Sequence, residues 1–324
     1  MADIVDTRTD AQAALTRAAE TLGRGVPVAI PTETVYGLAA DATNPQAITR
    51  IYEMKGRPRL NPLICHMADL AMAEEHAVFD PLSRRIAEAF WPGPLTLILP
   101  IRPESAIHPL VRAGLDTVGI RVPSGIASRL ISTFGQPLAA PSANTSGRIS
   151  PTSAHHVAED FGDKLELVLD AGPATVGLES TILKVEGETI RLLRPGGLDA
   201  ADVERVIGRP VLRNDKAGAT IEAPGMMASH YAPDAPVRLD ASDVRPGEVL
   251  IRFGGKALAG EDRAALVLDL SPSGDLAEAA TNLFGYMKQA DATGARSIAF
   301  SPIPATGLGE AINDRLQRAA APRG

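Results

Sequence analysis

Cysteine, aromatic residues and long apolar runs are scarce in this chain of 324 residues. Its one cysteine, Cys65, excludes an internal disulfide framework and a cysteine-rich zinc site. No apolar run approaches the roughly 18 residues of a membrane-spanning helix, and the first residues lack the basic and apolar regions of a signal peptide. These absences predict a cytoplasmic protein that does not bind a membrane.

Basic residues are fewer than acidic residues in this chain. The chain has 32 Lys and Arg residues against 39 Asp and Glu residues, a formal net charge of −7. Because nucleic-acid binding depends on neutralising phosphates, this balance disfavours a broad electrostatic grip on RNA or DNA, although it is compatible with a local basic patch. The hydrophobic fraction of 45% is that of a globular protein.

Several familiar catalytic signatures are missing. The sequence contains no P-loop, no dinucleotide-binding glycine motif after a strand and no Gly-x-Ser-x-Gly nucleophile elbow. Its six histidines do not occur at metal-ligand spacing with a third ligand nearby, so we predict no metal held by protein side chains. Cys65 lies in an apolar run, which favours an inert buried thiol over a nucleophile.

Length and patterning predict two domains, at about 150 residues each. Residues 1–208 mix crossover connections with a hairpin around Glu186 and Gly187, which predicts a mixed parallel and antiparallel sheet with helices. Residues 209–236 are rich in proline and glycine and lack periodicity, as a linker does. Residues 237–324 are predicted to form a small three-layer α/β domain.

Individual elements follow from the apolar spacing and from helix-cap and turn residues. We expect strands over residues 26–30, 63–66, 96–99, 118–122, 137–140, 167–170, 180–185, 189–193, 248–253, 265–270 and 297–300. We expect helices over residues 10–22, 45–55, 81–90, 125–134, 152–160, 199–207, 275–289 and 309–319.

Polar residues gather where the predicted strands end, which is where open α/β sheets bind ligands. Each cluster alone also fits an ordinary turn or a solvated loop, and Arg121 in an apolar strand also fits a structural ion pair. Lys55, Arg57 and Arg59 fit a phosphate site and a solvated basic loop equally well. The clusters cover residues 31–38, 55–63, 117–123, 140–152, 177–197 and 230–233.

Taken together, these clusters are rich in anion donors and poor in nucleophiles, because no Ser or Cys is matched with a recognisable base. The composition favours chemistry in which the substrate supplies the nucleophile and the protein positions anions. Phosphoryl and nucleotidyl transfer are reactions of this kind.

Five segments in order resemble the YrdC-like threonylcarbamoyl-AMP synthases: residues 31–38, 55–63, 90–96, 140–144 and 178–181. The resemblance is strong over residues 10–210 and extends to residues 307–316, and the appended domain resembles the long, two-domain form of that family. It implies a twisted mixed sheet followed by a small Rossmann-like domain.

The resemblance also implies a reaction. L-threonine and bicarbonate (or CO2) give a carbamate that attacks the α-phosphorus of ATP, which yields L-threonylcarbamoyladenylate and pyrophosphate. Partner proteins then pass the threonylcarbamoyl group to an adenosine of tRNA, while direct contact of this chain with tRNA, if any, is expected to be weak. Mg2+ is expected to accompany ATP, held by phosphate oxygens and water.

Site residues are carried over position by position. Threonine or its carbamate is expected at Thr34, His66, Arg121, Ala140 and Ser180, and ATP at Arg57, Asn61, Thr117, Ser142, Ser150, Arg194 and Tyr231. Lys55, Arg57, Ser142 and Asn144 match a polar tetrad typical of the family and are the predicted catalytic residues.

The linker departs from the family pattern. Residues 224–229 lack the basic and aromatic residues that often precede the His230-Tyr231 pair, but Tyr231 is kept, so we predict that the linker closes over the nucleotide. Two alternative functions agree less well with the sequence. A non-catalytic RNA-binding protein conflicts with the acidic balance and the single Trp. A related enzyme that uses carbamoyl phosphate would need zinc-finger and acylphosphatase-like modules, for which this chain has neither the cysteines nor the length.

Overall fold

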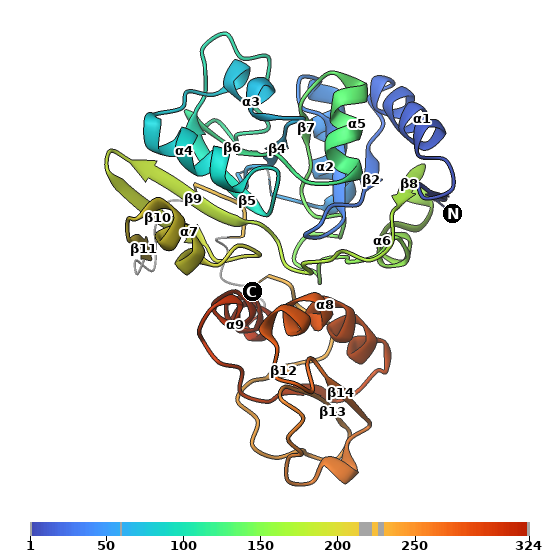
Figure 1. Ribbon diagram of the computed structural model, residues 1–324. Coiled ribbons are helices and arrows are strands. Elements are labelled where there is room, and N and C mark those ends of the chain that lie inside the picture. Colours follow the sequence, from blue (N-terminus) through green and yellow to red (C-terminus); the bar gives the residue numbers. More distant parts are fainter. Residues whose placement is uncertain (1, 59, 214–221, 226–229, 323–324) are drawn as a thin grey trace.

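The computed structural model describes residues 2–58, 60–213, 222–225 and 230–322 and has a large and a small α/β unit (Figure 1). Strands of the large unit are β1 (Asp3–Asp6), β2 (Val28–Ile30), β3 (Gly37–Asp41), β4 (Ile64–His66), β5 (Leu95–Pro100), β6 (Thr117–Arg121), β7 (Leu138–Ala139), β8 (Leu167–Asp170), β9 (Thr181–Glu186), β10 (Thr189–Arg194) and β11 (Val211–Arg213). Its helices are α1 (Ala11–Gly23), α2 (Pro45–Lys55), α3 (Leu70–His76), α4 (Pro81–Phe90), α5 (Ile126–Phe134), α6 (Ala154–Phe161), the 3-10 turn η1 (Gly162–Lys164) and α7 (Ala200–Ile207).

The strands of the large unit form one sheet in the order β1-β8-β2-β3-β7-β4-β6-β5-β9-β10-β11. The sheet contains both parallel pairs, such as β4 with β6, and antiparallel pairs, such as β5 with β6, so the predicted mixed sheet is confirmed. The predicted hairpin is also confirmed: β9 and β10 pair antiparallel, with Gly187 at φ 61° in the turn.

Local sequence explains where several helices begin and end. Asn44 caps α2 by accepting from the backbone N–H groups of Gln46 and Ala47, and Pro45 takes the first helical position, as expected. The same helix ends at Gly56, which has the left-handed conformation at φ 59°. Lys55 and Arg57 are therefore placed at a fixed helix end.

Some elements of the large unit were not predicted. Residues 37–41, for which the sequence analysis predicts no strand, form β3, whose small residues have little intrinsic strand preference. Pairing with β2 and β7 on its two sides decides the conformation instead. Likewise β1, α3 and β11 depend on tertiary contacts; β11 places the beginning of the predicted linker in the large sheet, beside β10.

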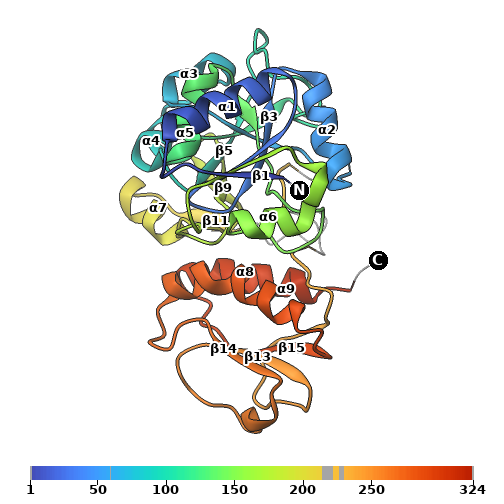
Figure 2. The same ribbon diagram turned by 90° about the vertical axis from the view of Figure 1, so that its right-hand side faces the viewer.

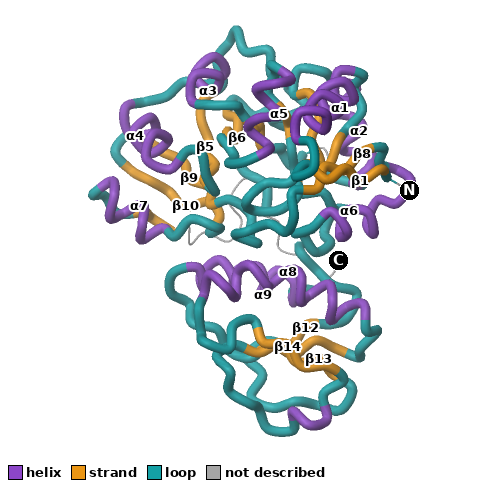
Figure 3. Tube along the Cα trace, turned by 45° about the vertical axis from the view of Figure 1, so that its right-hand side comes forward, coloured by secondary structure: helices purple, strands orange, loops and turns teal. Residues whose placement is uncertain are grey.

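The small unit contains β12 (Val237–Arg238), β13 (Glu248–Arg252), the 3-10 turn η2 (Glu261–Arg263), β14 (Leu266–Asp269), α8 (Leu276–Ala292), β15 (Ser297–Phe300) and α9 (Leu308–Ala320). Its four described strands are parallel in the order β12-β15-β13-β14. Both helices cover the face that looks toward the large unit (Figures 2 and 3). The other face is covered by loop residues such as Ala241 and Val244, so the predicted third layer consists of loops instead of helices.

The two units share a hydrophobic cluster. Val35, Ile149 and Leu178 of the large unit are buried together with Phe284 of α8 and Ile312 of α9. The units are thus packed directly on each other, not merely tethered. In the part of the chain that the structure describes, no helix has the length and apolar character to cross a bilayer.

Candidate active site

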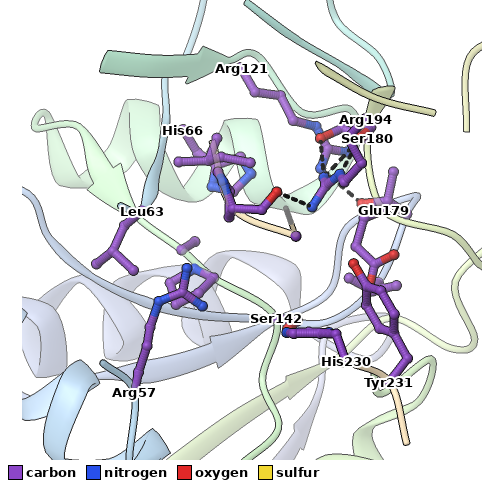
Figure 4. Close-up of a pocket in the computed structure, with 17 residues that line it drawn as sticks. Arg57, Leu63, His66, Arg121, Ser142, Glu179, Ser180, Arg194, His230 and Tyr231 are labelled. Carbon is purple, nitrogen blue, oxygen red and sulfur yellow. Dashed lines mark hydrogen bonds between the residues drawn. The ribbon is translucent and has the colours of Figure 1, made fainter. Parts of the chain in front are cut away.

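One cavity collects most of the predicted site residues (Figure 4). Its walls come from the last residues of β4, β6 and β10, from the loop after β7, from the segment before β9, and from described residues of the linker. Because β4 and β6 are parallel neighbours with His66 opposite Arg121, these two side chains are presented side by side. The cavity is lined by Thr34, His66, Arg121, Ala140 and Ser180 of the predicted threonine site and by Arg57, Ser142, Arg194 and Tyr231 of the predicted ATP site.

Arg121 is held on three sides at the end of β6. Its Nε donates to the Gly93 carbonyl oxygen (3.1 Å), its Nη1 to the Thr34 hydroxyl (2.8 Å), and its Nη2 lies 2.7 Å from a carboxylate oxygen of Glu33. The side chain is only 5% exposed. An ion pair and a position in the cavity wall are alternative interpretations of Arg121 from sequence. The structure has both, because the guanidinium that pairs with Glu33 also borders the cavity.

His66 is the clearest unsatisfied group of the site. Its side chain is buried, and both ring nitrogens lack a hydrogen-bond partner among the described residues. Burial, with Arg121 nearby, lowers the pKa of His66 well below its ordinary value, so the imidazole is neutral. A neutral imidazole offers one donor and one acceptor, and both remain available to a ligand in the cavity.

Lys55 and Asn144, two of the predicted catalytic residues, do not line the cavity. The Lys55 ammonium donates to the carbonyl oxygens of Ser142 (2.6 Å) and Asn144. The Asn144 amide donates to the carbonyl oxygens of Thr145 (2.8 Å) and Arg148 (3.0 Å). Both residues therefore fix the loop that presents Ser142, and burial lowers the pKa of Lys55 well below its ordinary value.

Arg57 reaches the cavity from the end of α2. Its Nε donates to the Asn61 carbonyl oxygen (3.2 Å) and its Nη2 to the Pro62 carbonyl oxygen (2.8 Å), and burial lowers its pKa to about 10. The Asn61 backbone thus helps to hold the Arg57 guanidinium in place. Thr117 lies at the start of β6, about 13 Å along the strand from Arg121, and neither Asn61 nor Thr117 lines the cavity.

Ser150, also predicted at the ATP site, is buried beneath the cavity wall. Its hydroxyl donates to one carboxylate oxygen of Glu179, and the Nε of Arg315 in α9 donates to the other (2.8 Å). Burial by itself raises the pKa of Glu179, but Arg315, Arg194 and these hydrogen bonds outweigh it and lower the pKa below the ordinary value. Glu179 is therefore an ionised group in the wall.

Arg194 connects the hairpin to the segment before β9 and to the linker. Its Nη2 donates to the Ser180 carbonyl oxygen (2.8 Å) and its Nη1 to the Pro224 carbonyl oxygen (3.3 Å). The Ser180 hydroxyl in turn lies 2.7 Å from the Thr96 hydroxyl. Arg194 thus orients both Ser180, which is predicted to contact the substrate threonine, and Pro224 of the linker.

The described part of the linker closes one side of the cavity. Pro224, Gly225, His230 and Tyr231 line it, and Ala223 is buried in a small apolar cluster on the large sheet. Residues 226–229, where the sequence departs from the family pattern, lie outside the described residues. Tyr231 lines the same cavity as Arg57, Ser142 and Arg194, which the sequence analysis also assigns to ATP.

Two acidic residues of the site were missed by the sequence analysis. Glu33 pairs with Arg121, and Glu179 lines the cavity and binds Ser150 and Arg315. A usable signal existed in both cases: each is a single acid next to a predicted site residue, Thr34 or Ser180, in a segment otherwise made of small, apolar and hydroxyl residues.

Carboxylates suited to a metal ion are not available here. Within the described ranges, no group of three or more His, Cys, Asp or Glu side chains is placed to hold an ion. Glu179, the acid in the cavity wall, already uses its two oxygens for Ser150 and Arg315. These residues do not fit a resident metal, so a divalent ion would have to arrive bound to a phosphate ligand.

Comparison with known proteins gives a consistent result. A family model of the Sua5/YciO/YrdC type, described as "Telomere recombination", matches residues 20–196, and one described as "Threonylcarbamoyl-AMP synthase, C-terminal domain" matches residues 198–321. The threonylcarbamoyl-AMP synthase of Pyrococcus abyssi is 41% identical, over 94% of this chain and 93% of that protein. That of Bacillus subtilis is 39% identical, over 99% of this chain and 97% of that protein.

A solved structure agrees with the fold over almost the whole chain. The crystal structure of P. abyssi Sua5 complexed with L-threonine is 38% identical, with a TM-score of 0.88, and the match covers 99% of this chain and 97% of that chain. The likeness therefore includes both units and their arrangement.

Proposed function

Because the chain belongs to the threonylcarbamoyl-AMP synthase family, we propose that it converts L-threonine, bicarbonate or CO2, and ATP into L-threonylcarbamoyladenylate and pyrophosphate. The observation that carries this proposal is one cavity. It brings the five residues predicted to bind the substrate threonine together with Arg57, Ser142, Arg194 and Tyr231. An adenylating enzyme needs such a juxtaposition, since an amino-acid carbamate must meet the α-phosphorus of a nucleotide.

Threonine is expected at the ends of β4 and β6. The fork of Arg121, preset by Glu33 and Thr34, suits a carboxylate. The neutral His66 offers one donor and one acceptor to a polar group of the same ligand. Because the carbamate itself is the nucleophile, the chain has to exclude water and align the reactants and needs no nucleophilic side chain.

The nucleotide is expected between Arg57 and Arg194. Their described hydrogen bonds go to backbone carbonyl oxygens and, for Arg194, also to the Ser180 hydroxyl, so their positive charge is not neutralised by a hydrogen-bonded carboxylate. Such preset cations stabilise the charge that develops on a phosphoryl group during transfer. Mg2+ belongs to this proposal as part of the Mg-ATP substrate.

In this proposal the large unit holds the substrates, the linker residues Pro224, Gly225, His230 and Tyr231 cover the nucleotide side, and the small unit supports both. The product is a reactive adenylate, so proteins that transfer the threonylcarbamoyl group to tRNA are the expected partners. The setting would be the cytoplasm, where tRNA and ATP are available.

Pyrophosphate release is the direct test. The protein is incubated with ATP and Mg2+, and L-threonine and bicarbonate are each omitted in turn. Release that requires both is expected. Release that is absent from every combination, although circular dichroism shows folded protein, would refute the synthase and favour a binding protein.

A further inference from the structure

The segment 307–316 has no part in the chemistry above, yet its side chains fix the start of α9. The Asn313 amide donates to the carbonyl oxygens of Ile303 (3.1 Å) and Gly309 (2.9 Å). A Cβ atom at Gly309 would lie 1.8 Å from the Pro304 carbonyl oxygen, so only glycine permits this close approach. The segment thus sets both the position and the rotation of the helix.

Arg315 is carried by that helix and has no exposed surface. Burying a guanidinium is costly unless its donors are paired. Its Nε donates to Glu179 (2.8 Å) and its Nη2 to the Pro195 carbonyl oxygen (3.0 Å), and both acceptors belong to the large unit. Its Nη1 pairs with the neighbouring Asp314. The side chain therefore crosses from the small unit to Glu179, which lines the cavity.

The same guanidinium contacts the linker. It lies over the ring of Tyr231, 5.0 Å from the centroid, and Phe284 of α8 stacks on that ring with centroids 5.6 Å apart. Tyr231 has an unusual backbone conformation for a residue with a side chain, at φ 62°. Contacts from both helices of the small unit hold it there.

We propose that Arg315 is a positioning residue of the active site: from the small unit it orients Glu179, with its partner Ser150, and Tyr231 on the nucleotide side of the cavity. This inference rests on the proposed function. Because Thr34, His66 and Arg121 are held by contacts within the large unit, the effect of Arg315 falls on ATP and on turnover, and threonine binding is spared.

Replacement by a side chain of similar length tests this. Arg315→Met is expected to lower kcat at least about tenfold and to raise the KM for ATP, with the KM for L-threonine within about twofold of wild type. Hydrogen exchange of the peptide that carries residues 230–235 is expected to become faster, and this readout does not depend on activity. Unchanged ATP kinetics and unchanged exchange would overturn the proposal.

Arg213→Met is the matched control. Arg213 also reaches across to α9, with its Nε 2.8 Å from Glu310, but this pair is partly exposed, and Glu310, unlike Glu179, does not line the cavity. Wild-type kinetics are expected for it, and a loss equal to that of Arg315→Met would overturn the proposal in favour of general interface damage.

Arg315→Lys keeps a charge and covers the case in which Arg315→Met does not fold. We expect a raised KM for ATP at a nearly unchanged melting temperature, because a single ammonium cannot reproduce the fork to Glu179 and Pro195. Wild-type kinetics in this variant would overturn the proposal. If wild-type protein itself releases no pyrophosphate, the proposed function fails, and exchange of residues 230–235 then still tests the positioning of Tyr231.

Discussion

The buried basic side chains in the cavity wall and behind it differ in the groups that hold them. Arg57 and Lys55 are hydrogen-bonded to backbone carbonyl oxygens, whereas Arg121 also has the carboxylate of Glu33 at 2.7 Å. A carbonyl orients a cation without cancelling its charge, so the buried charge of Arg57 is costly in the unliganded cavity and favours the binding of an anion. The lowered pKa values of both residues have the same cause, which is burial.

This difference predicts opposite effects on stability. Arg57→Met is expected to lower activity at least about tenfold while the free energy of unfolding of the unliganded protein stays within about 1 kcal/mol of wild type or rises. Arg121→Met also removes activity, but it leaves Glu33 buried without its partner and is expected to cost about 3 kcal/mol. Urea unfolding of both variants measures this, and equal destabilisation would contradict the distinction.

Buried histidines predict how stability depends on pH. Burial lowers the pKa of His66 well below its ordinary value and that of His230 to about 3, so in the folded protein both take up protons less readily than in the unfolded chain. The unfolded chain takes up protons below about pH 6.5, and stability therefore falls as the pH falls through this range, by about 2 kcal/mol for His230 between pH 7 and pH 5 and by a similar order for His66.

Urea unfolding at pH 7 and pH 5 checks this expectation. His66→Asn should remove about half of the contribution that His66 and His230 make together. His155→Asn is the control, since His155 is exposed on α6. In this variant the free energy of unfolding should decrease between pH 7 and pH 5 by as much as in wild type. If His66→Asn loses as much unfolding free energy between pH 7 and pH 5 as wild type, His66 does not contribute to the pH dependence of stability.

At the scale of elements, the site depends on close approach between strands and loops that are distant in sequence. Gly196, which follows β10, packs against the segment before β9, and a Cβ there would lie 2.3 Å from the Glu179 carbonyl oxygen and 2.5 Å from the Thr181 nitrogen. The contact keeps Glu179 and Ser180 at the cavity wall.

Gly196→Ala is therefore expected to destabilise the protein by about 1–3 kcal/mol and to reduce pyrophosphate release, because the added methyl group has to displace the backbone that carries Ser180. Gly23→Ala at the end of α1 meets nothing within 4 Å and should leave activity unchanged. Thermal unfolding together with the activity assay checks both variants. Normal activity in Gly196→Ala would show that this segment tolerates movement.

At the scale of the whole molecule, the two units are joined by a continuous interface. Gly177 approaches α8 so closely that a Cβ would lie 2.5 Å from the Ala280 carbonyl oxygen. Ion pairs such as Lys288 with Asp160 (3.1 Å) add polar contacts around the shared hydrophobic cluster. The units should therefore unfold together.

Calorimetry is expected to record one cooperative transition for the wild-type protein. Gly177→Ala combines a backbone clash with a strained φ of 78° and should separate the units, so that two transitions appear. Gly285→Ala, in α8 at the same interface, meets only the Thr152 hydroxyl at 4.0 Å and should keep a single transition with an equal or higher midpoint. Two transitions in the wild type would contradict the interpretation.

Much of this protein is determined by its sequence. The cap at Asn44, the turn at Gly187 and the apolar spacing of most helices and strands are local relations, so they can be read without the fold. The polar clusters at strand ends could also be recognised, because each is contiguous along the chain. The family resemblance then predicted most of the residues that line the cavity.

Only the tertiary structure decided how those residues are used. It placed Lys55 and Asn144 behind the loop, brought Glu33 and Glu179 to the site, and paired Glu179 with Arg315, which is 136 positions away in sequence. It also made β3 a strand and put both helices of the small unit on one face. The physical reason is that sequence patterns reflect neighbours one or two turns apart, whereas burial and ion pairing depend on which distant segments pack together.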